Sequence, residues 1–141
     1  MIMPEALADR VALLLTHAIG CTATFTQIAG VEALAGDQGM VDHVIKEYQQ
    51  RRDRIVSGLN NIPGVTCQTP QGAFYVFPNV KSFGISSSEL ARRIIEESGV
   101  AVLSGTDFGK FGEGYLRMCY ATSIDTIDRA LERLKGFFEK L

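Results

Sequence analysis

Apolar residues recur at helical spacing through the first 60 residues of the chain. Leu7, Val11, Leu14 and Ala18 fall on one stripe, and Pro4 and Gly20 suit the two ends of a helix. This segment is more apolar than a surface helix needs, so we expect it to pack on two sides. The same spacing, with glycines as stops, predicts three helices in all, at residues 4–20, 27–35 and 38–60.

The pattern changes after the turn signal at residues 62–64, and short strands dominate from there. A helix at 86–99 interrupts them, with Ser86 and Glu89 spaced as a capping box and Gly99 as its C-terminal stop. Ser123 is predicted to cap a last helix with a regular apolar stripe. The predicted strands are 64–69 and 73–80, joined as a hairpin, then 100–105 and 115–121.

This order of elements predicts an α+β fold: a small, mostly antiparallel sheet of about four strands with helices packed on it. The 141 residues are enough for one domain with a real core, and we expect residues 1–141 to form a single domain. A net charge of −2 and a pI near 5.7 argue against a nucleic-acid or anionic-membrane partner. Three scattered cysteines predict reduced thiols and a cytoplasmic location, and the two unclustered histidines argue against a metal site.

Arg117 lies in the middle of an otherwise apolar strand, YLRMCYA. Alternation places it on a mixed face with Tyr115 and Cys119, opposite a face that is plainly core. A guanidinium stays charged and needs an anion when it is partly buried. Two interpretations remain open from the residues alone: a clamp for a ligand carboxylate, or a structural arginine that is solvated or paired with Glu113 or Asp107.

The glycine-rich stretch SGTDFGKFGEG follows no nucleotide-binding pattern. Its spacing does not match a P-loop, and a strand follows where a dinucleotide fingerprint requires a helix. We interpret it as a turn or a flexible loop near a site. The chain offers no serine–histidine pair, no metal cluster and no carboxylate dyad, so its composition and spacing support no complete catalytic constellation.

Three motifs occur together in a specific order: PQGAFYVFP, then GVAVLSGTDFG, and finally GEGYLRMCYATS. With QIAGVEAL and the helix containing EYQQRRD ahead of them, they resemble the C-terminal small domain of fold-type-I, pyridoxal-phosphate-dependent aminotransferases. The resemblance is to the aspartate and aromatic aminotransferase group of class I/II, and it covers nearly the whole chain.

The resemblance favours the ligand interpretation of Arg117. In such enzymes the arginine of the G-Y-L-R strand binds the α-carboxylate of the substrate, and a bidentate clamp of this kind orients the α-carbon towards the cofactor. Gly72, Phe74 and Tyr75 would shape the substrate side, and the glycine-rich segment would be the mobile approach to it. The implied reaction moves an amino group between an amino acid and a 2-oxo acid.

A complete member of this family also has a large domain that holds pyridoxal 5′-phosphate and supplies the Schiff-base lysine. The resemblance covers only the small domain, so we expect no catalytic residue in this chain, no bound cofactor and no transamination by the isolated chain. Without the large domain the apolar first helix would be exposed, which predicts a homo-oligomer.

Two other functions stay open at this stage. The chain could be a free-standing module that binds amino acids or other carboxylates through Arg117 without catalysis. It could also be a structural or interaction domain in which Arg117 forms an internal salt bridge, in which case replacing Arg117 by alanine should unfold it.

Overall fold

The computed structural model describes residues 2–141, and the chain divides into two compact units after Met40. The first unit contains helices α1 (Glu5–Ala18) and α2 (Thr24–Ala35), and neither helix has a buried residue. The second unit, Val41–Leu141, contains the hydrophobic core. The expectation of a single domain over residues 1–141 stays a prediction.

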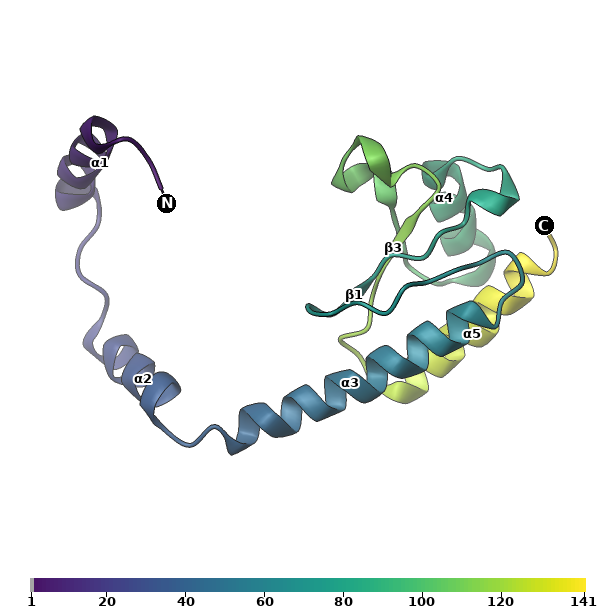
Figure 1. The fold of residues 1–141 in the computed structure, drawn as a ribbon, viewed down its shortest axis with the longest axis horizontal. Coiled ribbons are helices and arrows are strands. Elements are labelled where there is room, and N and C mark those ends of the chain that lie inside the picture. The colour runs from purple at the N-terminus through teal and green to yellow at the C-terminus, as the bar shows by residue number, and fades with distance from the viewer. Residues whose placement is uncertain (1) are drawn as a thin grey trace. The chain divides into compact units, whose positions relative to one another are not determined.

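The second unit is a two-layer α+β structure, as the sequence predicts. One face of its sheet packs against three helices, and Figure 1 shows two of them, α3 and α5, running alongside each other. Leu59, Ile94 and Leu134, one from each helix, are almost completely buried in the same cluster. The three helices are α3 (Gly39–Asn60), α4 (Ser87–Ser98) and α5 (Ile124–Phe138).

The sheet has three antiparallel strands in the order β1-β3-β2. Its central strand β3 (Leu116–Cys119) lies between β1 (Tyr75–Val76) and β2 (Leu103–Ser104). Tyr75 is opposite Cys119 in one pair, and Leu103 is opposite Arg117 in the other. The antiparallel arrangement is confirmed, and Arg117 therefore belongs to the middle strand.

The strand predicted at residues 64–69 is not formed, and only a single antiparallel bridge joins Thr66 to Asn79. The reason is local. The side chain of Asn60 donates a hydrogen bond to the carbonyl oxygen of Cys67 (2.9 Å) and accepts one from its N–H (2.8 Å). These contacts occupy backbone groups that a strand would use for a neighbouring strand.

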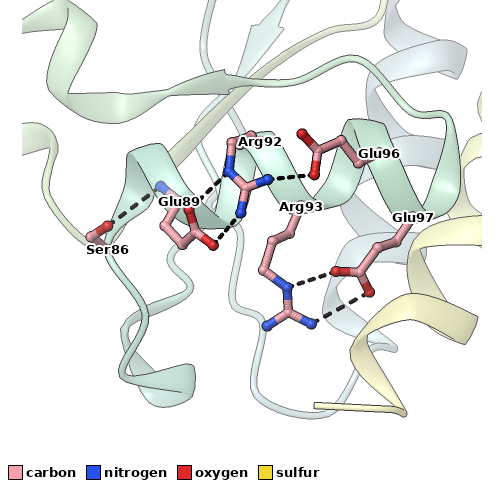
Figure 2. Close-up of polar contacts among 6 residues, drawn as sticks. All are labelled: Ser86, Glu89, Arg92, Arg93, Glu96 and Glu97. Carbon is pink, nitrogen blue, oxygen red and sulfur yellow. Dashed lines mark hydrogen bonds and ion pairs between the residues drawn. The ribbon is translucent and has the colours of Figure 1, made fainter.

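Helix α4 begins and ends at the capping residues that the sequence predicts, Ser86 and Gly99. The hydroxyl of Ser86 accepts a hydrogen bond from the N–H of Glu89, and Gly99 adopts the left-handed conformation with φ of 69°. The carboxylate of Glu89 bonds Arg92, so the reciprocal half of the predicted capping box is not formed in the described chain (Figure 2). Contacts with Arg92 and Arg93 lower the pKa values of Glu89 and Glu97, respectively.

Three further turns of 3-10 helix occur in the second unit, at Lys81–Phe83, Gly105–Phe108 and Lys110–Gly112. The last two make up most of the glycine-rich segment, between β2 and β3. Ser123 caps α5 by accepting a hydrogen bond from the N–H of Thr126, which confirms the predicted start of that helix. Within residues 2–141, no helix has both the length and the hydropathy that a membrane crossing requires.

Candidate functional site

The two faces of β3 differ sharply, as alternation predicts. Leu116 and Met118 are buried, and Tyr120, just beyond the strand, continues the same core face. Arg117 is half-buried on the other face, next to the exposed Cys119. The sheet therefore presents the guanidinium of Arg117 on the side that the helices do not cover.

Two aromatic rings stack on the guanidinium of Arg117. The centroid of Tyr75 lies 4.0 Å from Cζ of Arg117, and the centroid of Phe108 lies 3.9 Å from the same atom. Tyr75 reaches it because residues on one face of paired strands are diagonal neighbours: Tyr75 is opposite Cys119, two residues beyond Arg117. Phe108 comes from the glycine-rich segment that leads into β3.

The rings cover the flat faces of the guanidinium and leave its edges open. A ring that met an N–H edge would have its centroid farther from Cζ, because the nitrogens project beyond that carbon. Tyr75 and Phe108 make no ring–ring contact with each other among the described residues, so they occupy different sides of Arg117. The N–H groups, which form the hydrogen bonds of an arginine, lie in the plane between the two rings.

Those N–H groups have no acceptor from the protein. Within residues 2–141 no carboxylate lies within 4.0 Å of Arg117, and no oxygen accepts a hydrogen bond from it. Glu113, one of the two acids considered as a partner, accepts a hydrogen bond from the N–H of Ser87 instead. No buried side-chain nitrogen of the described residues lacks a partner, so the free nitrogens of Arg117 are in contact with solvent.

A small hollow of about 190 Å³ adjoins Arg117. Its walls combine the sheet face with the segment that follows α4, and they are mostly apolar. An arginine beside apolar walls is a stronger anion site than one in open water, because the local dielectric constant is lower. The lining residues are Tyr75, Ala101, Val102, Leu103, Arg117 and Cys119.

The segment that carries Phe108 is closed at its base by two glycines. A Cβ atom built on Gly105 would lie 2.2 Å from the carbonyl oxygen of Gly112, a contact that no other residue tolerates without movement of the backbone. The N–H of Gly105 also donates to the carbonyl of Tyr115 (2.9 Å). The glycines thus shape a tight loop that projects Phe108, a role different from phosphate binding.

A buried hydroxyl fixes the end of this loop. Ser87, at the start of α4, is completely buried. Its Oγ accepts hydrogen bonds from the N–H groups of Gly114 (2.8 Å) and Tyr115 (3.2 Å) and lies 3.4 Å from the carbonyl oxygen of Gly112. The side chains of Ser87 and Glu113 therefore both tie the approach to β3, and hence the position of Arg117, to the start of α4.

The four residues selected from the sequence line two adjoining hollows, and the rings of Phe74 and Tyr75 are in contact, with centroids 4.6 Å apart. Tyr75 contacts Arg117 directly. Gly72 and Phe74 line a neighbouring hollow with Tyr48, on the α3 side of the strand. Between them Ala73 has a positive φ of 60°, and its carbonyl accepts a hydrogen bond from the hydroxyl of Tyr120 (2.9 Å). A ligand role for Gly72 and Phe74 stays a prediction.

Sequence reasoning missed Phe108 as a site residue. The ring stands before Gly109 in the stretch TDFG, where an aromatic side chain in a glycine-rich loop is itself a signal. A large aromatic side chain in a surface loop often packs on a neighbouring group. Here the ring of Phe108 packs on the guanidinium of Arg117.

Comparison with known proteins gives a consistent result. The family model "Aminotransferase class I and II" matches residues 1–134. The aspartate aminotransferase of Pyrococcus horikoshii is 39% identical over 141 residues, which is 99% of this chain and 36% of that protein. A putative aminotransferase of Bacillus subtilis is 40% identical over 137 residues, 97% of this chain and 35% of that protein.

Solved structures show the same fold. The aspartate aminotransferase from Rhizobium meliloti matches with a TM-score of 0.86 and 31% identity, over 98% of this chain and 36% of that one. An aromatic aminotransferase from Pyrococcus horikoshii matches with a TM-score of 0.86 and 34% identity, over 97% of this chain and 37% of that one. The chain belongs to the class I and II aminotransferase family. It spans about a third of the length of the relatives it matches.

Proposed function

We propose that this chain is the substrate-carboxylate part of a pyridoxal-phosphate-dependent aminotransferase, with Arg117 as the carboxylate clamp. The observation that carries the proposal is the free guanidinium edge: Arg117 is half-buried, stacked on two rings and without any anion from residues 2–141. A half-buried arginine that the fold leaves unpaired is suited to an anion that arrives with a ligand.

The chemistry of the family defines that ligand. A transaminase acts on an amino acid and a 2-oxo acid, and both carry a planar carboxylate next to the reacting carbon. A guanidinium presents two parallel N–H groups that match the two oxygens of such a carboxylate. Two bonds fix the orientation of the acid as well as its position, which is the contribution that a positioning group makes to rate.

The cofactor would be held outside this chain. When bound, pyridoxal phosphate supplies the electron sink for bond changes at the α-carbon. The lining of the hollow beside Arg117 includes no lysine, and among the described residues Lys81 and Lys110 instead lie over the rings of Tyr115 and Phe111. The residues described here do not fit a cofactor site, so the lysine and the phosphate-binding groups would belong to the large domain of the complete enzyme.

The alternative is a free-standing carboxylate-binding module that uses the same arginine without chemistry. The same free guanidinium edge supports it, and calorimetry separates the two functions. If this chain is only one part of an enzyme, the rest of its substrate site is missing, and it should bind aspartate or 2-oxoglutarate only weakly. A module whose function is binding should show clear saturation with either acid. Saturable, Arg117-dependent binding of the lone chain at low ligand concentration would contradict the enzyme-part proposal.

The cofactor part of the proposal has its own test. The isolated chain should give no stoichiometric, lysine-specific adduct when it is mixed with pyridoxal phosphate and reduced with borohydride. A single modified lysine found by peptide mapping would overturn the assignment of roles, because it would place the cofactor group within this chain.

A further inference from the structure

Phe108 has no role in the proposal above, although its ring centroid is as close to the Arg117 guanidinium as that of Tyr75. Phe108 remains about half exposed, so burial in the core does not explain its position. Its loop is closed by the contact of Gly105 with Gly112 and anchored by Ser87. The fold therefore holds an exposed ring in a defined place.

The effect of the second ring is to create a slot. With Tyr75 alone, one face of Arg117 would be open, and an anion could approach from above as well as from the edge. With both faces covered, only the edge remains, and the free N–H groups lie in a plane between two apolar walls. A planar carboxylate fits between such walls, whereas a tetrahedral sulfonate or phosphonate places an oxygen out of the plane, against a ring.

Stacking also fixes the guanidinium before a ligand arrives. A free arginine side chain samples many rotamers, and ordering it costs binding free energy. Cation–π contact on both faces reduces that cost in advance and raises the affinity for a correctly oriented acid.

We propose that Phe108 is a positioning and specificity residue: it sets the plane of Arg117 and restricts the site to planar carboxylates over tetrahedral anions. This inference rests on the proposed role of Arg117 as a carboxylate clamp. It adds a second residue to that site and a selectivity that the clamp alone does not provide.

The test uses the side-chain Nε–H signal of Arg117 in two-dimensional ¹H–¹⁵N NMR of the whole chain, assigned by its disappearance in Arg117→Lys. Acetate is the planar probe and methanesulfonate is the tetrahedral one, each titrated at high concentration because a half-site binds weakly. The variants are Phe108→Ala and Phe108→Leu, and Leu retains apolar bulk without a π face. The matched control is Phe111→Ala, which removes an exposed ring from the same loop that has Lys110 as its cation partner.

The unmodified chain and Phe111→Ala should show an Arg117 signal shifted upfield by the rings and a preference for acetate over methanesulfonate. Both Phe108 variants should lose part of the upfield shift, and acetate affinity should fall about two- to fivefold, as expected for one lost cation–π contact. The preference for acetate should shrink with Phe108→Ala, which removes one wall of the slot, and should be largely kept with Phe108→Leu, which retains apolar bulk there.

Two outcomes would contradict these proposals, one the role of Phe108 and the other the role of Arg117. If acetate perturbs Arg117 in every variant with unchanged selectivity, the role of Phe108 is wrong and the carboxylate clamp stands. If neither anion perturbs the Arg117 signal in any form of the chain, the proposed role of Arg117 as a carboxylate clamp is wrong. The proposed role of Phe108 in specificity is then wrong as well.

Discussion

Gly105 and Gly112 approach each other so closely that their backbones are in contact across the base of the loop that carries Phe108. A Cβ atom on Gly105 would lie 2.2 Å from the carbonyl oxygen of Gly112 and 2.7 Å from that of Tyr115. Both obstacles are backbone atoms, which cannot rotate away as a side chain can. This contact connects a glycine pattern in the sequence to the position of a ring on Arg117.

Gly105→Ala should therefore destabilise the chain by about 1–3 kcal/mol or more, since overpacking at a backbone contact cannot be relieved locally. It should also displace Phe108 and weaken the ring-current shift of Arg117. Urea unfolding and the NMR signal of Arg117 measure the two effects.

The control is Gly136→Ala, because Gly136 is in α5 with nothing within 4 Å of its added Cβ. Higher helix propensity should stabilise that variant by about 0.5–1 kcal/mol. A Gly105→Ala chain as stable as the parent would contradict the close contact.

Arg117→Ala should stay folded. Its loss removes two cation–π contacts, worth about 0.5–1 kcal/mol each at an accessible site, and leaves no carboxylate of the described chain unpaired. Thermal or urea unfolding measures the change. A loss of about 3–5 kcal/mol, as when an internal buried ion pair is broken, would favour the structural interpretation of this arginine.

Ser87→Ala should cost about 1–3 kcal/mol, because the N–H groups of Gly114 and Tyr115 would lose a buried acceptor. Ser57→Ala is the control, because Ser57 is an exposed helical serine on α3, away from this loop. Equal effects of the two substitutions in urea unfolding would show that the buried hydroxyl does not anchor the loop.

The parts of the site that follow local rules were predictable from the sequence. Alternation placed Leu116 and Met118 in the core and Arg117 on the opposite face, and the caps at Ser86 and Ser123 follow from residue type and spacing. These features depend on residues within a few positions of one another, so the pattern contains the necessary information.

The features that were not predicted depend on contacts between distant segments. The bonds from Asn60 to Cys67 replace part of an expected strand, and Ser87 reaches a loop more than 20 residues away. Phe108 stacks on Arg117 only because Gly105 and Gly112 close the loop between them. No periodicity encodes such contacts, and only the folded chain shows them.

Association of the chain is expected from its N-terminal helices. Within the described part of α1 and α2 no residue is buried, and large apolar side chains such as Leu14, Phe25 and Leu34 are exposed. Exposed apolar stripes favour self-association. Light scattering should show dimers or larger species, and the double substitution Leu14→Gln with Leu34→Gln should reduce the mean mass. Thr16→Gln on α1 is the control. A clean monomer at high concentration would contradict this expectation.

The most direct test of the central claim replaces the matching segment of the Pyrococcus horikoshii aspartate aminotransferase with this chain. The hybrid would then be assayed with Arg117 intact, with Arg117→Lys, and with Arg92→Lys as a surface control. We predict that the intact hybrid transaminates, that Arg92→Lys is unchanged, and that Arg117→Lys lowers kcat/KM about ten- to a hundredfold, the value of a hydrogen bond to a charged group. An Arg117→Lys hybrid with the kcat/KM of the intact one would show that the carboxylate is held elsewhere.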